Sequence, residues 1–370
     1  MAANGYRLAM FSPAGGVLPD LTEYAGWSLA YSDKNVGVCV VTIAGTERKL
    51  TDWITGSWLE VWRSVNGITY LEGDRHWRLL DIRSYRDADG AYLHELWFFD
   101  PLLWLKARHV LYAAGTAQAE MTDQADDMLK AVVKDNLGSD AVAGRDLSAY
   151  VTIDADLSRG ASITKGFAWR EVLTTLREIC QQNEQAGGGW LTFDLVRTGA
   201  NTDAFRTYTG HRGTDRTSEP AISWERGNLR EPSITISNYD APNHITAAGR
   251  GEETARVTAE AYLANLTPRT RWEGFIDARN TGTDASTTAE LTALALAEAN
   301  AELNRVQPRV YFTGSIAETE NYRWGINVNY GDLVKVEFDG YTFEARVNAV
   351  MITMDSAGAE TLTVRMEATA

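Results

Sequence analysis

The chain has 370 residues, 44% of them hydrophobic and 23% charged, and a formal net charge of −15. This composition is typical of a globular protein, and the length predicts two to four domains. It has no apolar run of about 18 residues and no basic-then-apolar N-terminus, so neither a membrane-spanning segment nor a signal peptide is predicted. The excess of acidic residues argues against a protein that binds the nucleic-acid backbone, because such binding needs clustered Lys and Arg. It allows nucleic acid to slide past.

Strands and turns dominate the chain from Tyr6 to Trp104. Short alternating or apolar runs are separated by Gly, Pro, Asn and Asp, and no amphipathic helix of useful length interrupts them. This pattern predicts a small antiparallel barrel or sandwich. Six tryptophans of this region are expected to pack in it: Trp53, Trp58, Trp62, Trp77, Trp97 and Trp104.

Helical spacing appears next. Apolar residues between Thr122 and Leu137 recur at helical intervals, with Gly138 at the expected end, and a second helix is predicted from about Ala168 to Asn183. The strand runs WLTFDLV and DAFRTYTG follow, joined through RTGANT. Residues 106–230 are therefore predicted to form an inserted α+β domain.

A third helix is predicted after the strand runs PSITISNYD and HITAAGRG. Thr287 and Glu290 have capping-box spacing, apolar residues then recur every three or four positions, and Pro308 lies just beyond the expected end. From Val310 onward the chain again reads as strands and turns. This predicts a helix-containing insertion at 251–307.

One strand pattern occurs twice in the sequence. GSWLEVWRSVNGITY begins at Gly56, and YGDLVKVEFDGYTFEARV contains a similar hairpin that begins at Gly331. Asn66-Gly67 and Asp339-Gly340 should both form two-residue turns with positive φ, which match the twist of the flanking strands. A further turn also recurs, as DADGA from Asp87 and DSAGA from Asp355. The recurrence predicts a structural duplication.

Few residues carry a chemical signature. Cys39 and Cys180 lie in apolar surroundings, where buried free thiols are favoured over a disulfide. The histidines are scattered and have no metal-ligand spacing: His76, His94, His109, His211 and His244. The loop DADLSRG places Asp154, Asp156 and Ser158 at alternate positions, but it lacks the glycine and the closing Glu of a calcium loop.

Paired carboxylates and one basic turn are the remaining candidates. Asp126-Asp127 and Glu252-Glu253 could serve a glycosidase, but adjacent acids on a helix point apart. The turn TGHRGTDRT, with Arg212, Asp215 and Arg216, could bind an anion; a charged turn tied to its neighbours by Arg–Asp pairs is favoured. No catalytic, cofactor-binding or metal-binding residue is predicted, and the chain is expected to be no enzyme and to need no cofactor.

The order of these segments resembles the tail-tip hub proteins of long-tailed bacteriophages. The family is related in fold to the baseplate hub of contractile tails and to the N-terminal part of tail-associated lysins. The residues that carry the resemblance are the opening strand run from Tyr6, AAGTAQAEMTDQADDMLKAVVKDNLG, FAWREVLTTLREIC, TYTGHRGTDRT, ITAAGRGEETAR and the closing hairpin.

The resemblance implies an α+β, mainly β fold with two small antiparallel β-barrels and inserted α+β domains. The N-terminal barrel would span 1–105, and the second would combine 231–250 with 308–370. Three chains would then form a ring of six barrels that joins a six-fold tail tube to a three-fold tip around a DNA channel. Many relatives continue into a lytic domain, but this chain stops at Ala370, so lytic activity is not implied.

The resemblance also implies partners and a location. The chain would act as a homotrimer at the virion tail tip, after assembly in the host cytoplasm. The distal tail protein or tail tube would lie above it, tip, fibre or receptor-binding proteins below, and DNA would pass without specific binding. The alternative is a tail component that binds or degrades carbohydrate on the host surface, through its tryptophans or a carboxylate pair.

Overall fold

The computed structural model describes residues 5–45, 53–111, 119–167, 169–239, 241–279, 286–306, 309–319 and 322–369. The strands are β1 (Gly5–Phe11), β2 (Tyr24–Ser32), β3 (Asn35–Ala44), β4 (Trp58–Val65), β5 (Ile68–Arg86), β6 (Tyr92–Phe99), β7 (Ala119–Gln124), β8 (Val151–Ile153), β9 (Ser162–Phe167), β10 (Leu191–Gly199), β11 (Thr202–Thr209), β12 (Ile222–Ser223), β13 (Leu229–Ser237), β14 (His244–Ala248), β15 (Thr258–Tyr262), β16 (Glu273–Asp277), β17 (Arg309–Ile316), β18 (Leu333–Phe338), β19 (Tyr341–Met354) and β20 (Glu360–Ala368). The helices are α1 (Leu103–Lys106), α2 (Ala125–Leu137), α3 (Val172–Gln185), α4 (Thr288–Arg305) and the 3-10 turn η2 (Glu253–Ala255). The mainly β, α+β fold class is confirmed.

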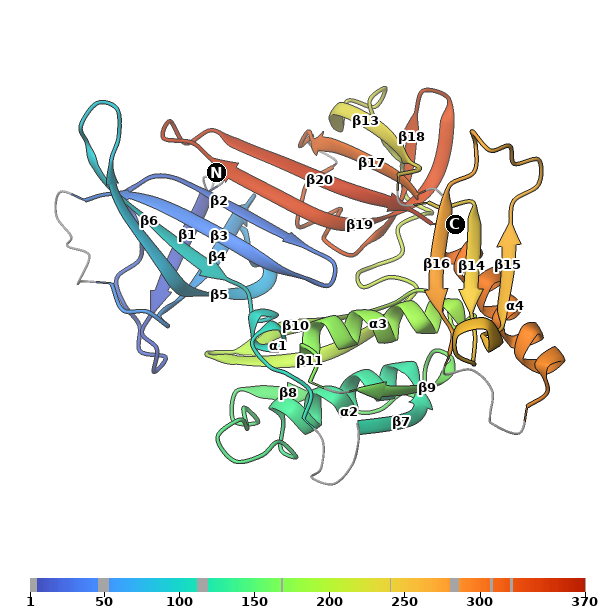
Figure 1. Ribbon diagram of the computed structural model, residues 1–370. Coiled ribbons are helices and arrows are strands. Elements are labelled where there is room, and N and C mark those ends of the chain that lie inside the picture. Colours follow the sequence, from blue (N-terminus) through green and yellow to red (C-terminus); the bar gives the residue numbers. More distant parts are fainter. Residues whose placement is uncertain are drawn as a thin grey trace.

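Most strands of the described residues belong to one large sheet. Its order is β1-β4-β5-β6-β3-β2-β19-β20-β17-β13, and β18 and β12 continue from β19. Strands β1–β6 are drawn in blue and cyan in Figure 1, and β17–β20 in orange and red beside them. Because β2 pairs with β19, the N-terminal and C-terminal strand sets are parts of one sheet.

The two expected barrels do not close. Within the described residues β1 pairs with β4 alone among the named strands, and β2 turns its other edge to β19 instead of closing onto β1. Both strand sets also share one hydrophobic core, in which Trp27 and Leu29 join Val350 and Ile352. The continuation of the sheet from one set into the other explains the difference, since an edge already paired cannot close a barrel.

The two strand sets nevertheless repeat one topology. The N-terminal set has the order β1-β4-β5-β6-β3-β2, and the C-terminal set has the order β12-β18-β19-β20-β17-β13. Each N-terminal strand therefore corresponds, in chain order and in position within the sheet, to one C-terminal strand. The pairs are β1 and β12, β2 and β13, β3 and β17, β4 and β18, β5 and β19, and β6 and β20. β1 and β12 differ in direction, since β1 is antiparallel to β4 and β12 is parallel to β18.

Register and irregularities repeat as well. Leu79 lies opposite Phe98, and Val347 lies opposite Met366, with the next residue bulged in each long strand. The N–H of Gly56 donates to the carbonyl of Leu79 over 2.8 Å, and the N–H of Gly331 donates to that of Val347 over 2.9 Å. A shared fold class would not by itself reproduce the bulge position, so the two sets are a structural duplication.

The turns predicted from the repeated sequence have the same geometry. Asn66 and Gly67 have φ of 51° and 81°, and Asp339 and Gly340 have φ of 50° and 78°, as predicted. In the second turn pair, the carboxylate of Asp87 accepts the N–H of Ala91, and that of Asp355 accepts the N–H of Ala359, both over 2.8 Å. These turns therefore keep both long strands in register with their neighbours.

Two inserted segments lie outside the large sheet. Helices α2 and α3 share a core with β8, β10 and β11, while α4 packs on the small sheet β15-β14-β16. The second insertion falls between β13 and β17, where the equivalent strands β2 and β3 are joined by a tight turn. The expected barrel segment 231–250 is thus divided, because β13 joins the large sheet and β14 the small one.

The helices begin and end close to the predicted positions. Thr287 and Glu290 form the predicted capping box, in which each side chain bonds the other residue's backbone N–H. The N–H of Gly138 donates to the carbonyls of Val133 and Lys134, which ends α2. Pro308 and Ala168, which were expected beside two of these helix ends, lie outside the described residues.

Buried ion pairs join the large sheet to the first insertion. The guanidinium of Arg75, 1% exposed, donates to Asp100 and, over 2.7 Å, to Asp194 on β10. Arg197 on β10 likewise reaches the buried carboxylate of Glu60 on β4. Charges removed from water must be paired, so these contacts fix the position of the inserted segment on the sheet.

Asp100 should make the stability of the protein depend on pH. Burial raises its pKa from 3.8 to about 6, although the charge of Arg75 acts to lower it. Between these values the folded protein holds a proton that the unfolded chain has lost, so this group's contribution to stability is complete below about pH 4 and is lost as pH rises through 6.

The replacement of Asp100 by Asn removes this titration. The difference in free energy of unfolding, wild type minus D100N, should fall by about 2 kcal/mol between pH 4 and 7. Urea denaturation of both proteins across this range measures it. A difference that is constant, or that grows with pH, would contradict the assignment.

Candidate assembly surface

The histidines and cysteines that the sequence offered lie apart. His76 and His94 are buried and contact Asp203 and Ser84, while His244 is buried against Tyr262 in the small sheet. Cys39 and Cys180 are buried free thiols, as predicted, and burial raises the pKa of both. Within the described residues no three His, Cys, Asp or Glu side chains are placed to hold a metal ion.

The acids at the start of α2 bind the loop that resembled a calcium site. Both oxygens of Asp127 accept bonds from Ser158, from its backbone N–H over 3.2 Å and its hydroxyl over 3.1 Å. Asp126 accepts the N–H of Arg159 over 2.6 Å, and Lys130 donates to Asp126 over 3.2 Å. These carboxylates are fully occupied in holding the loop on the helix. Glu252 and Glu253 lie in an exposed turn.

The basic turn TGHRGTDRT is tied to its neighbours, as the favoured interpretation predicted. Arg216 donates to Asp332 over 2.7 Å, and the N–H of Thr214 donates to the same carboxylate over 2.7 Å. The Nε of Arg212 lies 2.9 Å from Asp194. Asp215 accepts the N–H of Thr217 within the turn. The turn therefore attaches the first insertion to the C-terminal strand set.

The tryptophans of the N-terminal strands mostly pack inside. Trp53, Trp58 and Trp77 are buried, and Trp58 stacks on Phe11 with ring centroids 4.2 Å apart. Trp62, Trp97 and Trp104 are half-buried. A sugar-binding platform needs aromatic faces open to solvent, so this set does not supply one.

The contact between the two strand sets is built from strand pairing and buried polar groups. β2 pairs antiparallel with the end of β19, where Tyr31 lies opposite Val350 and both are at most 3% exposed. Arg63 pairs with Glu318 and Glu360, each over 2.8 Å, across the two sets. We call this contact the intrachain joint.

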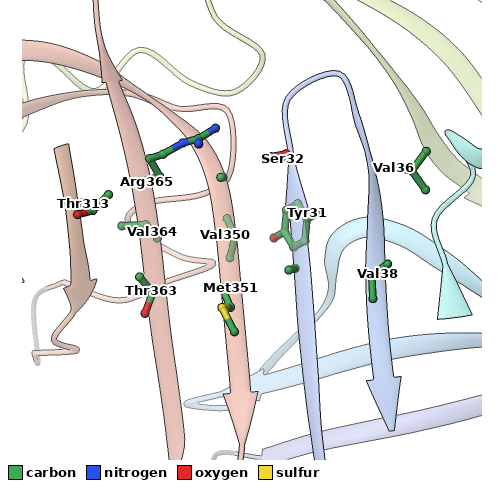
Figure 2. A pocket seen from close by; sticks show the side chains of 12 residues that line it. Tyr31, Ser32, Val36, Val38, Thr313, Val350, Met351, Thr363, Val364 and Arg365 are labelled. Atoms are coloured by element: carbon green, nitrogen blue, oxygen red, sulfur yellow. The ribbon is translucent and has the colours of Figure 1, made fainter. Parts of the chain in front are cut away.

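A groove of about 350 Å³ crosses the intrachain joint on the sheet face opposite the core. Figure 2 shows lining residues from β17, β20 and β19 on one side, and from β2 and β3 on the other. The side chains are small, apolar or hydroxylated, and Arg365 alone among the lining residues carries a charge. Its Nε donates to the amide oxygen of Asn348 over 3.1 Å.

Among the strand edges that have no partner in the described part of the chain, two lie at corresponding places of the repeat. β4 pairs with β5 up to Arg78, so the same edge of β5 is unpaired from Asp81 to Arg86. β13 pairs with β17 on one edge alone. The sequence reasoning missed both edges, although the internal repeat was the signal that could have located them, because it pairs each strand of one set with its counterpart in the other.

The fold is that of bacteriophage tail proteins. The chain is similar to the tail protein from Neisseria meningitidis MC58, with 14% identity, a TM-score of 0.58 and coverage of 98% of this chain and 96% of that one. It is also similar to the 43 kDa tail protein of prophage MuSo2 from Shewanella oneidensis, with 11% identity, a TM-score of 0.57 and coverage of 98% of both chains.

The sequence places the chain within a family. Residues 35–366 match the Siphovirus ReqiPepy6 Gp37-like protein family, and the chain belongs to that family. Comparison with curated proteins gives no match. The chain is thus a siphovirus tail protein and a virion component, which confirms the resemblance seen in the sequence. No helix in the described ranges is long and apolar enough to cross a membrane.

Proposed function

We propose that three copies of this chain form the hub of the tail tip, with a central channel for DNA. The observation that carries the proposal is the duplication of one six-strand topology within a single sheet. A chain that offers the same strand set twice can present six similar units in three copies. Such a ring matches a six-fold tail tube on one side and a three-fold tip on the other.

The groove face suits a channel wall. Its lining is mostly apolar or hydroxylated, its one charged side chain is tied to Asn348, and the chain as a whole carries a net charge of −15. A DNA backbone is held by clustered Lys and Arg, and like charge prevents it from sticking. We assign this face to the lumen, through which DNA passes without specific binding.

The role is structural rather than enzymatic. The candidate carboxylates Asp126 and Asp127 are engaged by Arg159, Lys130 and Ser158, and the matched family and folds are those of tail proteins. The hub would contact the tail tube or distal tail protein above and tip, fibre or receptor-binding proteins below. A permanent assembly of this kind buries about 2,000 Å² or more per interface.

The mass of the purified chain in solution tests the proposal. We expect three times the chain mass of 40.8 kDa by native mass spectrometry or light scattering. Assembly that requires the neighbouring tail proteins would appear instead in the intact particle, as three copies around the tube axis. A particle with one or six copies, an off-axis position, or a clearly basic lumen would refute the hub.

A further inference from the structure

We propose that β13 of one copy pairs antiparallel with the free edge of β5 in the next copy, in the register of the intrachain joint. The partner is thus a second copy of this chain, and the contact links the copies head to tail. The inference rests on the proposed ring, and it specifies which residues form the contact between chains.

The duplication identifies these two edges as the missing half of a repeated contact. In the intrachain joint, β2 of the N-terminal set covers the edge of β19 beyond its bulge. By the strand correspondence, β13 is the counterpart of β2, and β5 is the counterpart of β19. The same contact between β13 and β5 is not made within the described chain, where both edges are open.

The register follows from residue equivalence. Ile82 lies opposite Leu96 as Val350 lies opposite Val364, which makes Ile82 the counterpart of Val350. Phe312 and Cys39 are counterparts, because Phe312 lies opposite Met366 and Cys39 lies opposite Phe98. Ile234 lies opposite Phe312, and Leu29 lies opposite Cys39, so Ile234 is the counterpart of Leu29. The resulting pairs between copies are Asp81 with Ser237, Ile82 with Ile236, Arg83 with Thr235, Ser84 with Ile234, and Tyr85 with Ser233.

Exposure supports this assignment. Ile236 is 62% exposed, whereas its counterpart Tyr31 is 3% exposed inside the intrachain joint. Ile82 is half-buried, and its counterpart Val350 is 2% exposed. The predicted pair thus consists of two isoleucines that a second copy would remove from water, and no like charges face each other across the register.

Free edges can also be protected against pairing, and some features here suit that role. Charged residues and proline blunt edge strands, and these edges carry Asp81, Arg83 and Pro232. Pro232, however, falls within the irregularity between Arg230 and Ser233, outside the five predicted pairs. Pairing from Ser233 to Ser237 therefore remains open to a partner strand.

Cysteine cross-linking distinguishes strand pairing between copies from edges that are protected against pairing. Arg83 and Thr235 are both exposed, and the predicted register places them opposite each other. We expect the double variant R83C/T235C, oxidised at high protein concentration, to lose its monomer band on a non-reducing gel. The products should be covalent oligomers that end in one closed ring. The native cysteines are buried, so they should add little background.

Matched variants control the geometry. Ala30 and Met351 lie opposite each other in the intrachain joint and are the counterparts of Thr235 and Arg83. A30C/M351C should therefore lose two titratable thiols in denaturant without forming oligomers. R83C/I236C moves the register by one residue and places the thiols on opposite faces, so it should remain uncrosslinked.

Each outcome has one meaning. Cross-linking by R83C/T235C, with none by either single variant, supports the proposed pairing, and the copy number of the closed ring then tests the three-fold hub separately. Cross-linking by R83C alone would indicate a two-fold contact and overturn the pairing. A native trimer without the predicted cross-link overturns the pairing but leaves the hub intact. A chain that stays monomeric and uncrosslinked also overturns the pairing, and the hub is then judged in the particle.

Discussion

Replacing Arg75 by methionine is expected to lower the free energy of unfolding by about 3–5 kcal/mol. The guanidinium is 1% exposed and pairs with Asp100 and Asp194 between the large sheet and the first insertion. Methionine fills a similar volume but leaves two buried carboxylates without this partner, and the lost pairing outweighs any gain in apolar packing. Urea denaturation measures the change.

A methionine at Arg7 provides the matched control. Arg7 lies on β1 of the same sheet and pairs with Asp20 over 2.7 Å, but its side chain is 62% exposed. Exposed ion pairs contribute about 0–1 kcal/mol, so R7M should leave stability nearly unchanged. Equal losses from R7M and R75M would show that burial does not set the cost.

Alanine at Gly331 should destabilise the protein by about 3 kcal/mol, and alanine at Gly56 by about 1 kcal/mol. These glycines are counterparts, with φ of 86° and 89°. Both substitutions therefore place a side chain on a left-handed backbone, which destabilises the protein. At Gly331 the added Cβ would also lie 2.7 Å from the Cβ of Arg212, whereas at Gly56 the nearest atom is 3.8 Å away, in Pro13.

The backbone around Gly331 cannot move away easily. Its N–H donates to Val347 over 2.9 Å, and its carbonyl accepts the N–H groups of Arg212 and Gly213 over 3.2 and 2.8 Å. The charged turn is thereby held against the strand, which makes the added methyl group costly. Thermal and urea unfolding of G331A and G56A measure both values. Equal destabilisation by the two substitutions would mean that the packing of the charged turn against Gly331 adds nothing to the cost of G331A.

Local chemistry explains which elements could be predicted from the sequence. The turns at Asn66-Gly67 and Asp339-Gly340 need positive φ, which Asn, Asp and Gly supply, and neighbouring residues alone decide them. The capping box of Thr287 and Glu290 is similarly local. Repetition of these local signals was enough to indicate the duplication, although few residues are identical between the copies.

The sequence by itself determined the fold class, the helix ends, the hairpin turns and the repeat, because each depends on residues close together in the chain. The tertiary structure alone decided that β2 pairs with β19, that both strand sets share one core, and that Arg75 joins Asp100 to Asp194. These contacts connect segments far apart in the chain, and the side chains that make them have no fixed spacing. An edge strand in sequence looks the same whether its partner is β1, β19 or another copy, so the pairing that replaced closed barrels with one continuous sheet was decided by packing.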